Sequence, residues 1–144
     1  MLTIRETLAV FSNFLKTNFK NKVSSQDITE NFTRETFYIK FDNIISNDYM
    51  QKFLEKDITI RVVYFPKNDT DNIIELLEKQ DELIKVFAQA NVIKLKDGVY
   101  ANITEYNTSI IDKTLHFDFE AYVFEEYDEI THEVMQEISH NTKF

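Results

Sequence analysis

His116, Asp118 and Glu120 are the residues of this chain whose types and spacing most resemble a reactive site. Side chains two residues apart on a β-strand lie on the same face, so these three groups share one face of any strand that carries them. An imidazole and two carboxylates are a ligand set that divalent metal ions accept. The alternative is the solvated face of a sheet whose Phe117 and Phe119 are buried. We favour this alternative, because three residues in line on one strand rarely converge on one ion without a second element.

A second group of ionisable side chains is acidic: Glu125, Glu126, Asp128, Glu129, Glu133 and Glu137. Such a cluster can mimic the charge of DNA phosphates or repel DNA inside a channel, whereas a solvated helix face is the more ordinary interpretation. The seven tyrosines also have two interpretations: they lie at an edge that contacts another protein, or they lie in the core of the sheet.

Several catalytic architectures are excluded by residue counts. The chain has no Cys, one Gly and one Pro, so it cannot build a thiol nucleophile, a Walker loop, a dinucleotide fingerprint or a nucleophile elbow. No Ser, His and Asp grouping has the signature of a hydrolase. We therefore predict a protein that is not an enzyme, with no catalytic residues, no metal and no cofactor.

Length and composition predict one folded domain. The chain has 144 residues, of which 43% are hydrophobic and 14% aromatic, enough for a core without disulfides or metals. The formal charge is 16 minus 25, or −9, which disfavours gripping a phosphate backbone. The charge is also uneven: residues 1–68 carry 10 basic and 8 acidic side chains (+2), and residues 69–144 carry 6 and 17 (−11). No segment has the pattern of a signal peptide or a membrane span, so we expect a soluble protein without a membrane partner.

The first half of the chain predicts a helix, a short strand and two longer strands. Thr3 and Glu6 form a capping box, and apolar residues then recur at helical spacing as far as Phe19. A short strand is expected near Val23. Alternating residues predict strands around 37–41 and over 58–64, the second ending at Pro66. The polar segment between them, 43–51, is expected to be a loop or the tip of an extended hairpin.

The second half predicts another helix and an antiparallel meander. N-cap candidates in segment 68–71 precede a helix that ends near Ala90, with an apolar stripe of Ile73, Leu76, Leu77, Ile84 and Phe87. Asp97-Gly98 and Asp112-Lys113 predict turns joining strands over 92–95, 100–111 and 115–123. The spacing of Ile130, Val134 and Ile138 predicts a short C-terminal helix.

These elements predict an α+β fold: a mixed, mostly antiparallel sheet with two main amphipathic helices on one face and a short C-terminal helix. We expect residues 1–125 to form the domain and residues 126–144 an acidic helical extension. The peripheral segments 43–51 and 126–144 are the expected contact regions. Their candidate interface residues are Ile44, Tyr49, Met50, Ile130, Val134 and Ile138.

Four segments together resemble a known family: the opening helix at 2–6, the strand at 34–39, the strand and exit at 60–66, and the closing hairpin at 112–119. They are similar to the small tail terminator proteins of tailed phages, prophages and phage-tail-like bacteriocins. The resemblance covers about residues 1–125.

This resemblance implies a structural role in the virion. Such proteins form a ring, commonly a hexamer, on the end of the tail tube, stop its polymerisation and provide a docking surface for the head connector. The implied partners are further copies of the chain, the tail tube protein and possibly sheath and connector proteins, with genomic DNA only as cargo through the lumen. The implied location is the host bacterial cytoplasm during assembly and then the head-proximal end of the tail. The alternative function is an acidic binding module that mimics nucleic acid or inhibits a basic partner.

Overall fold

A computed structural model describes residues 2–25, 34–68 and 70–126 as two helices and one six-stranded sheet. In chain order the elements are α1 (Ile4–Asn18), β1 (Lys22–Ser24), β2 (Thr36–Tyr49), β3 (Phe53–Tyr64), α2 (Ile73–Gln89), β4 (Val92–Lys96), β5 (Val99–Ile111) and β6 (Thr114–Glu126). The expected α+β class and the mixed sheet are confirmed. The expected C-terminal helix, with Ile130, Val134 and Ile138, lies outside the described residues.

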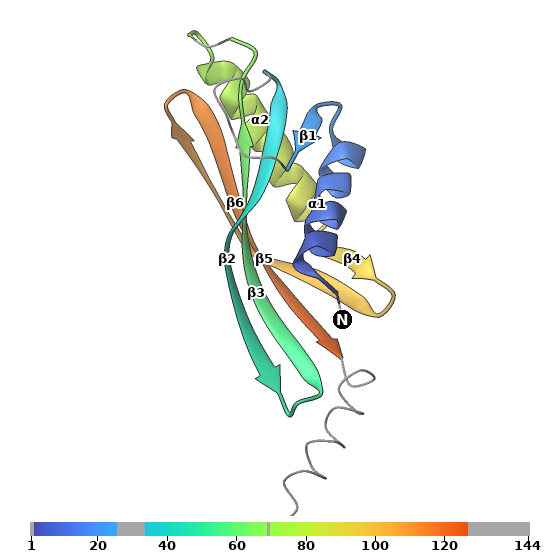
Figure 1. Ribbon diagram of the computed structural model, residues 1–144. Coiled ribbons are helices and arrows are strands. Elements are labelled where there is room, and N and C mark those ends of the chain that lie inside the picture. The colour runs from blue at the N-terminus through green and yellow to red at the C-terminus, as the bar shows by residue number, and fades with distance from the viewer. Residues whose placement is uncertain (1, 26–33, 69, 127–144) are drawn as a thin grey trace, which may run out of the picture.

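The sheet has the order β1-β2-β3-β6-β5-β4, in which every pair is antiparallel except β1 with β2 (Figure 1). This order places the strands of the first half of the chain at one end of the sheet and those of the second half at the other.

The helix α1 starts as its sequence predicts. Thr3 accepts a hydrogen bond from Glu6 N at 3.1 Å, and the Glu6 carboxylate accepts one from Thr3 N at 3.3 Å, which completes the capping box. Phe11 and Leu15 are then buried, one turn apart. This face fixes α1 on the sheet.

The segment 43–51 is an extended hairpin and not a loop. Strand β2 continues through it to Tyr49, and β3 starts at Phe53, five residues before the expected start. Of the two alternatives that the polar residues left open, the hairpin is therefore confirmed, because strand pairing satisfies the backbone groups of these residues whatever their side chains. The hairpin reaches well beyond the helices at the bottom of Figure 1.

The helix α2 corrects two details of the sequence prediction. Its N-cap is Asn72, outside the expected segment 68–71, and the Asn72 side chain donates to Asn68 O and to Lys113 O at 3.0 and 3.2 Å. Its buried line is Leu76, Leu83 and Phe87, whereas Ile73 and Leu77 are exposed. The second of these hydrogen bonds joins the start of α2 to the β5–β6 turn. The spacing of apolar residues alone does not predict which side of the helix faces the sheet.

The hairpin turns of the second half are confirmed. Lys96 pairs with Val99 around Asp97-Gly98, and Ile111 pairs with Thr114 around Asp112-Lys113. Gly98 has a φ of 81°. Both Asp112 and Lys113 also have positive φ, 50° and 60°, as a type I′ turn requires.

One aromatic cluster joins both helices to β6. The rings of Phe11 and Phe87 lie 5.3 and 4.6 Å from the ring of Phe119, and Phe14 contacts Phe87 at 5.3 Å. Buried side chains of both helices and of the sheet belong to one core. A smaller buried cluster of Tyr38, Val63 and Phe65 lies apart from it.

Candidate interaction surfaces

The candidate metal ligands lie on one face of β6, where Glu120 is exposed and the other two, His116 and Asp118, are engaged with neighbouring groups. Arg61 donates from Nε and Nη2 to the two Asp118 carboxylate oxygens at 2.8 and 3.0 Å. His116 Nε2 lies 3.1 Å from Thr114 Oγ1. Within residues 2–25, 34–68 and 70–126, no three His, Asp or Glu side chains are placed to hold a metal ion. The face therefore presents ion pairs across neighbouring strands.

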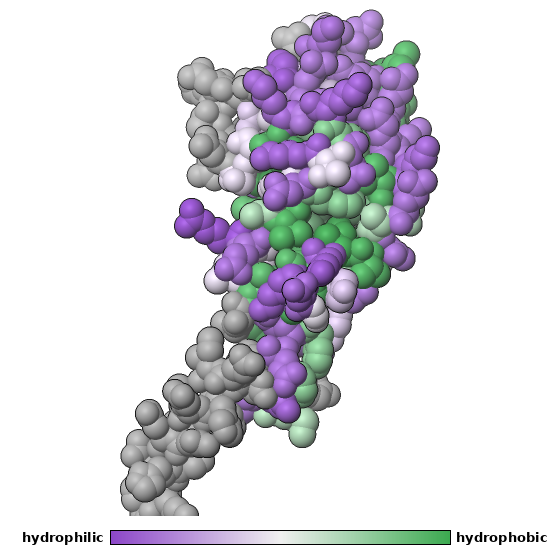
Figure 2. Space-filling view, turned by 90° about the vertical axis from the view of Figure 1, so that its right-hand side faces the viewer, coloured by the Kyte–Doolittle hydropathy of each residue, from purple (hydrophilic) through white to green (hydrophobic). Residues whose placement is uncertain are grey.

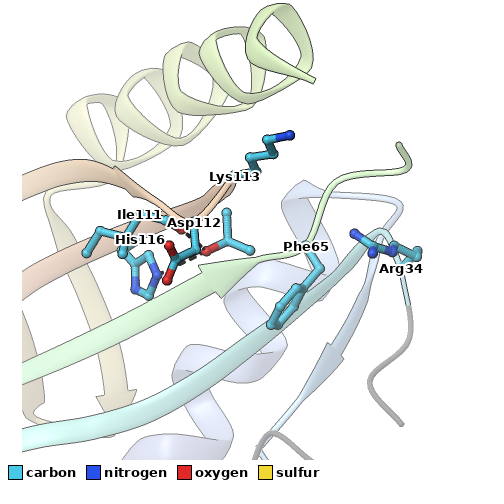
Figure 3. Close-up of a pocket in the computed structure, with 7 residues that line it drawn as sticks. Arg34, Phe65, Ile111, Asp112, Lys113 and His116 are labelled. Atoms are coloured by element: carbon cyan, nitrogen blue, oxygen red, sulfur yellow. Dashed lines mark hydrogen bonds between the residues drawn. The ribbon is translucent and has the colours of Figure 1, made fainter. Parts of the chain in front are cut away.

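His116 also lines a depression of about 420 Å³ at the β5–β6 turn. Figure 3 shows Arg34 and Phe65 on one side of it, with Ile111, Asp112 and His116 on the other. Burial lowers the pKa of His116, and the nearby Arg61 charge lowers it further. The His116 Nδ1 atom is buried without a hydrogen-bond partner. The walls combine cations, a carboxylate and apolar surface.

The acidic group expected near the end of the chain begins with a buried residue. Glu125 is only 2% exposed, and its Oε1 lies 3.3 Å from Lys56 Nζ. Its Oε2 accepts a hydrogen bond from Leu2 N at 3.1 Å. Glu125 is therefore unavailable as a surface mimic of phosphate, contrary to that hypothesis. Glu126 is half exposed and lies 3.5 Å from Lys52, and the other four acids lie outside the described residues.

The hairpin end carries a surface that sequence reasoning found only in part. Met50 is 82% exposed at its tip, while Ile44 is half-buried and packs against the core. Ile45, on the opposite face of β2 from Ile44, is 53% exposed. As interface residues, Ile44, Tyr49 and Met50 stay predictions, and Ile130, Val134 and Ile138 lie outside the described residues.

Two aromatic residues extend this surface. The rings of Phe53 and Phe124 are stacked at 5.1 Å, and Phe124 is 43% exposed. We call Ile45, Met50, Phe53 and Phe124 the hairpin patch. Alternation continued from Phe37 and Phe41 would place Ile45 on the core face, but a β-bulge between Phe41 and Asn43 reverses the faces, so the sequence pattern alone could not have identified Ile45.

A second exposed apolar surface lies where α2 meets β5. Lys79, on one flank of α2, lies over the Phe37 and Tyr64 rings at 5.9 and 5.2 Å, toward β2 and β3. By helix geometry Ile73 and Leu77 occupy the opposite flank, toward β5. They are 52% and 47% exposed.

The adjacent strand completes this surface. Tyr106 and Ile110 of β5 are each 38% exposed, and they pair with the core residues Phe119 and Leu115 of β6, so they lie on the helix-bearing face. We call Ile73, Leu77, Tyr106 and Ile110 the edge strip. The sequence did not identify it, because Ile73 and Leu77 were placed in the apolar stripe of the helix and the strand over 100–111 was given no core face.

A third surface lies on the side of the molecule that α1 and β4 form. Figure 2 shows hydrophobic side chains gathered in its middle, with hydrophilic side chains above and below. An apolar centre with polar surroundings is a common arrangement at protein contacts. The described residues include no helix with the length and apolar character needed to cross a bilayer.

Comparison with known proteins assigns the chain to a family. The family model described as "Phage tail terminator protein" matches residues 9–134, most of the sequence. No curated protein matches the chain. The family is a structural one with a role in tail completion, and it places the protein among virion tail components. The chain, with its mixed sheet and its exposed apolar surfaces, belongs to the phage tail terminator family.

Proposed function

We propose that this protein forms a ring on the head-proximal end of the tail tube, stops tube polymerisation and provides the docking surface for the head connector. Assembly takes place in the host cytoplasm, with DNA as cargo through the lumen. The observation that carries the proposal is the projecting β2–β3 hairpin, in a chain of the tail terminator family, with its apolar hairpin patch at the end.

The hairpin patch suits a contact with the tube. Ile45, Met50 and Phe124 are exposed apolar side chains, and burying one fully contributes about 1.5 to 3 kcal/mol. The paired backbone of β2 and β3 holds these side chains at a distance from the helices. A projecting, internally paired hairpin can enter the end of a tube without disturbing the core of its own domain.

The test is polymerisation of the cognate tail tube protein with and without this chain. We expect added protein to shorten the tubes and to form a ring at one end in electron micrographs. The double variant Ile45→Ser/Met50→Ser should lose tube binding while keeping its fold, measured by circular dichroism.

The matched control is Ile74→Ser on α2, where Ile74 is 70% exposed and far along the chain from the hairpin. It should cap tubes as the unchanged protein does. Tubes of unaltered length without bound protein would contradict the proposal, and equal capping by both variants would exclude the hairpin patch as the contact.

A second candidate, the acidic binding module, is favoured by the charge of the described second half. Residues 70–126 carry 5 basic and 12 acidic side chains, a net −7. Binding of a basic partner through exposed charges weakens with salt, because the Debye length falls to about 10 Å at 0.1 M. A complex with a basic protein that dissociates at moderate salt, together with failure to bind tubes, would favour this candidate.

A further inference from the structure

The third apolar surface, on the side formed by α1 and β4, carries basic groups. It is built from segments 2–25 and 92–98, which hold 6 basic and 2 acidic side chains, a net +4. The basic residues are Arg5, Lys16, Lys20, Lys22, Lys94 and Lys96, and the acidic ones are Glu6 and Asp97. Lys16 and Lys20, at the end of α1, are exposed. This side therefore attracts an acidic partner.

The other two apolar surfaces are acidic. Segments 43–57 and 120–126, which carry the hairpin patch, hold 2 basic and 6 acidic side chains, a net −4. Segments 73–89 and 103–111, which carry the edge strip, hold 2 basic and 5 acidic side chains, a net −3. Of the three surfaces, only the one on the side of α1 and β4 attracts an acidic segment, and the other two repel it.

The apolar part of this surface includes one flank of α1. Val10 and Phe14, one helical turn apart, are only partly buried, and the exposed Thr17 continues the same flank. The Phe14 ring lies 5.3 Å from the Phe87 ring, so the flank faces the end of α2, which β4 follows in the chain. Figure 2 shows hydrophobic side chains gathered in the middle of this side. We call Val10, Phe14 and Thr17 the α1 flank, a surface against which an amphipathic helix can pack.

Residues 127–144 have the complementary composition. They hold 4 acidic side chains and 1 basic one, a net −3: Asp128, Glu129, Glu133, Glu137 and Lys143. Ile130, Val134 and Ile138 are spaced four apart, which places them on one face of a helix. Such a helix offers apolar side chains to the α1 flank and carboxylates to the basic groups around it.

The end of β6 lies beside this surface. Glu125 Oε2 accepts a hydrogen bond from Leu2 N at 3.1 Å and lies 3.7 Å from Lys96 Nζ, so the chain leaves β6 between the start of α1 and the end of β4 (Figure 1). As a helix, residues 127–144 would span about 27 Å, whereas α1 spans about 22 Å, so they can follow α1 over its whole length. Attachment to the same molecule raises the effective concentration of the segment, which favours its own chain over a second copy.

We propose that residues 127–144 dock as an amphipathic helix on the α1 flank of their own chain. The helix runs parallel to α1, because it starts beside the first turn of α1, and its carboxylates lie toward the basic groups of segments 2–25 and 92–98. The inference goes beyond the proposed function, since it concerns the isolated protein and assigns neither the tube contact nor the contact between copies. It implies that this surface is occupied within the molecule, whereas the hairpin patch and the edge strip remain for contacts with other proteins.

The absence of Cys from the sequence allows a direct test by thiol cross-linking. The variant Thr17→Cys/Asn141→Cys places one thiol in the last turn of α1 and one near the end of the docked helix. Equal amounts of unlabelled and ¹⁵N-labelled protein are mixed at low salt, treated with a short bismaleimide and digested for mass spectrometry. We expect linked peptide pairs that are both light or both heavy, which form within one chain. A second pair, Asn13→Cys/Gln136→Cys, tests the contact one turn earlier.

The basic groups are tested by a change of charge in the first pair. Lys16→Glu/Lys20→Glu should lower the yield of the linked peptides several-fold, because it reverses two charges beside the α1 flank. Lys67→Glu/Lys85→Glu is the matched control, since it changes the net charge equally at exposed positions outside segments 2–25 and 92–98. An equal yield in both charge variants would contradict the electrostatic part of the inference.

The control for position is Asp81→Cys/Asn141→Cys, in which Asp81 is exposed on α2, and it should give a yield about tenfold lower than the first pair. If neither α1 pair exceeds this control in protein that is folded by circular dichroism, the inference fails. Linked pairs of one light and one heavy peptide would also overturn it, because the segment would then dock on a second copy. No tail tube is present in this experiment, so its failure leaves the proposed function standing.

Discussion

Lys56 Nζ lies 3.3 Å from Glu125 Oε1 in the interior of the protein, where both side chains are almost fully buried. Lys56 Nζ also donates to Leu2 O at 3.1 Å, and Glu125 Oε2 accepts from Leu2 N at the same distance. Lys96 Nζ stands 3.7 Å from Glu125 Oε2 at the surface of this network. The ion pair of Lys56 and Glu125 thus joins the segment before α1 to the first, turn-proximal residues of β3 and to the end of β6.

Glu125→Gln is expected to destabilise the protein strongly. Removing the carboxylate charge leaves the Lys56 ammonium buried without its partner, which costs about 3 to 5 kcal/mol of unfolding free energy. Urea denaturation measures this loss. The double variant Lys56→Met/Glu125→Leu should recover much of it, because no buried charge remains, and a double variant as unstable as the sum of the singles would contradict this account.

Phe87→Ala tests the position of α2. The Phe87 ring is fully buried against Phe14, Phe117 and Phe119, so its loss should cost about 3 to 5 kcal/mol. The matched change Leu77→Ala, one residue from the buried Leu76, should cost under about 0.5 kcal/mol because Leu77 is exposed. Equal losses in thermal or urea unfolding would mean that the helix is rotated relative to this description.

Local patterns predicted the parts of the fold that local chemistry determines. The capping box at Thr3, the turn at Asp97-Gly98 and the alternation of β6 depend on residues within a few positions of each other. The length of β2 depends instead on β3, and the burial of Leu83 in place of Leu77 depends on how α2 lies on the sheet. These features have no local sequence signal.

The contact surfaces were predictable only in part, for a related reason. An exposed apolar residue and a core residue look alike in a sequence until the partner of each strand is known. Ile45 and the edge strip became visible only once strand pairing assigned each residue to a face of the sheet. The ion pair of Lys56 and Glu125, 69 residues apart, likewise follows from register and not from spacing.

Lys113→Gly is expected to stabilise the β5–β6 turn. Lys113 has a φ of 60°, a region that costs a side chain with a β-carbon about 1 to 2 kcal/mol. Glycine removes that cost but has more freedom in the unfolded chain, so the net gain should be roughly 0.5 to 1 kcal/mol. Lys113→Ala is the matched control, since it removes the same side chain without relieving the backbone. A glycine variant no more stable than the alanine variant would contradict this.

His116 should make the stability of the protein depend on pH near neutrality. Burial, then the charges of Arg61 and Lys40, lowers the pKa of His116 in the folded state, although Asp118 and Asp112 act in the opposite direction. In the unfolded chain its pKa returns to about 6.5. Between these two values the unfolded state binds more protons than the folded state. The contribution of His116 to the free energy of unfolding is therefore fully present above pH 6.5 and decreases as the pH falls below it.

Urea denaturation at intervals from about pH 8 to pH 5.5 should show this decrease, and His116→Gln should show less of it, because glutamine does not titrate. Parallel curves for the two proteins over that range would mean that His116 has the same pKa in the folded and unfolded states. The buried Nδ1 atom would then not lower the pKa of His116, and this account would be wrong.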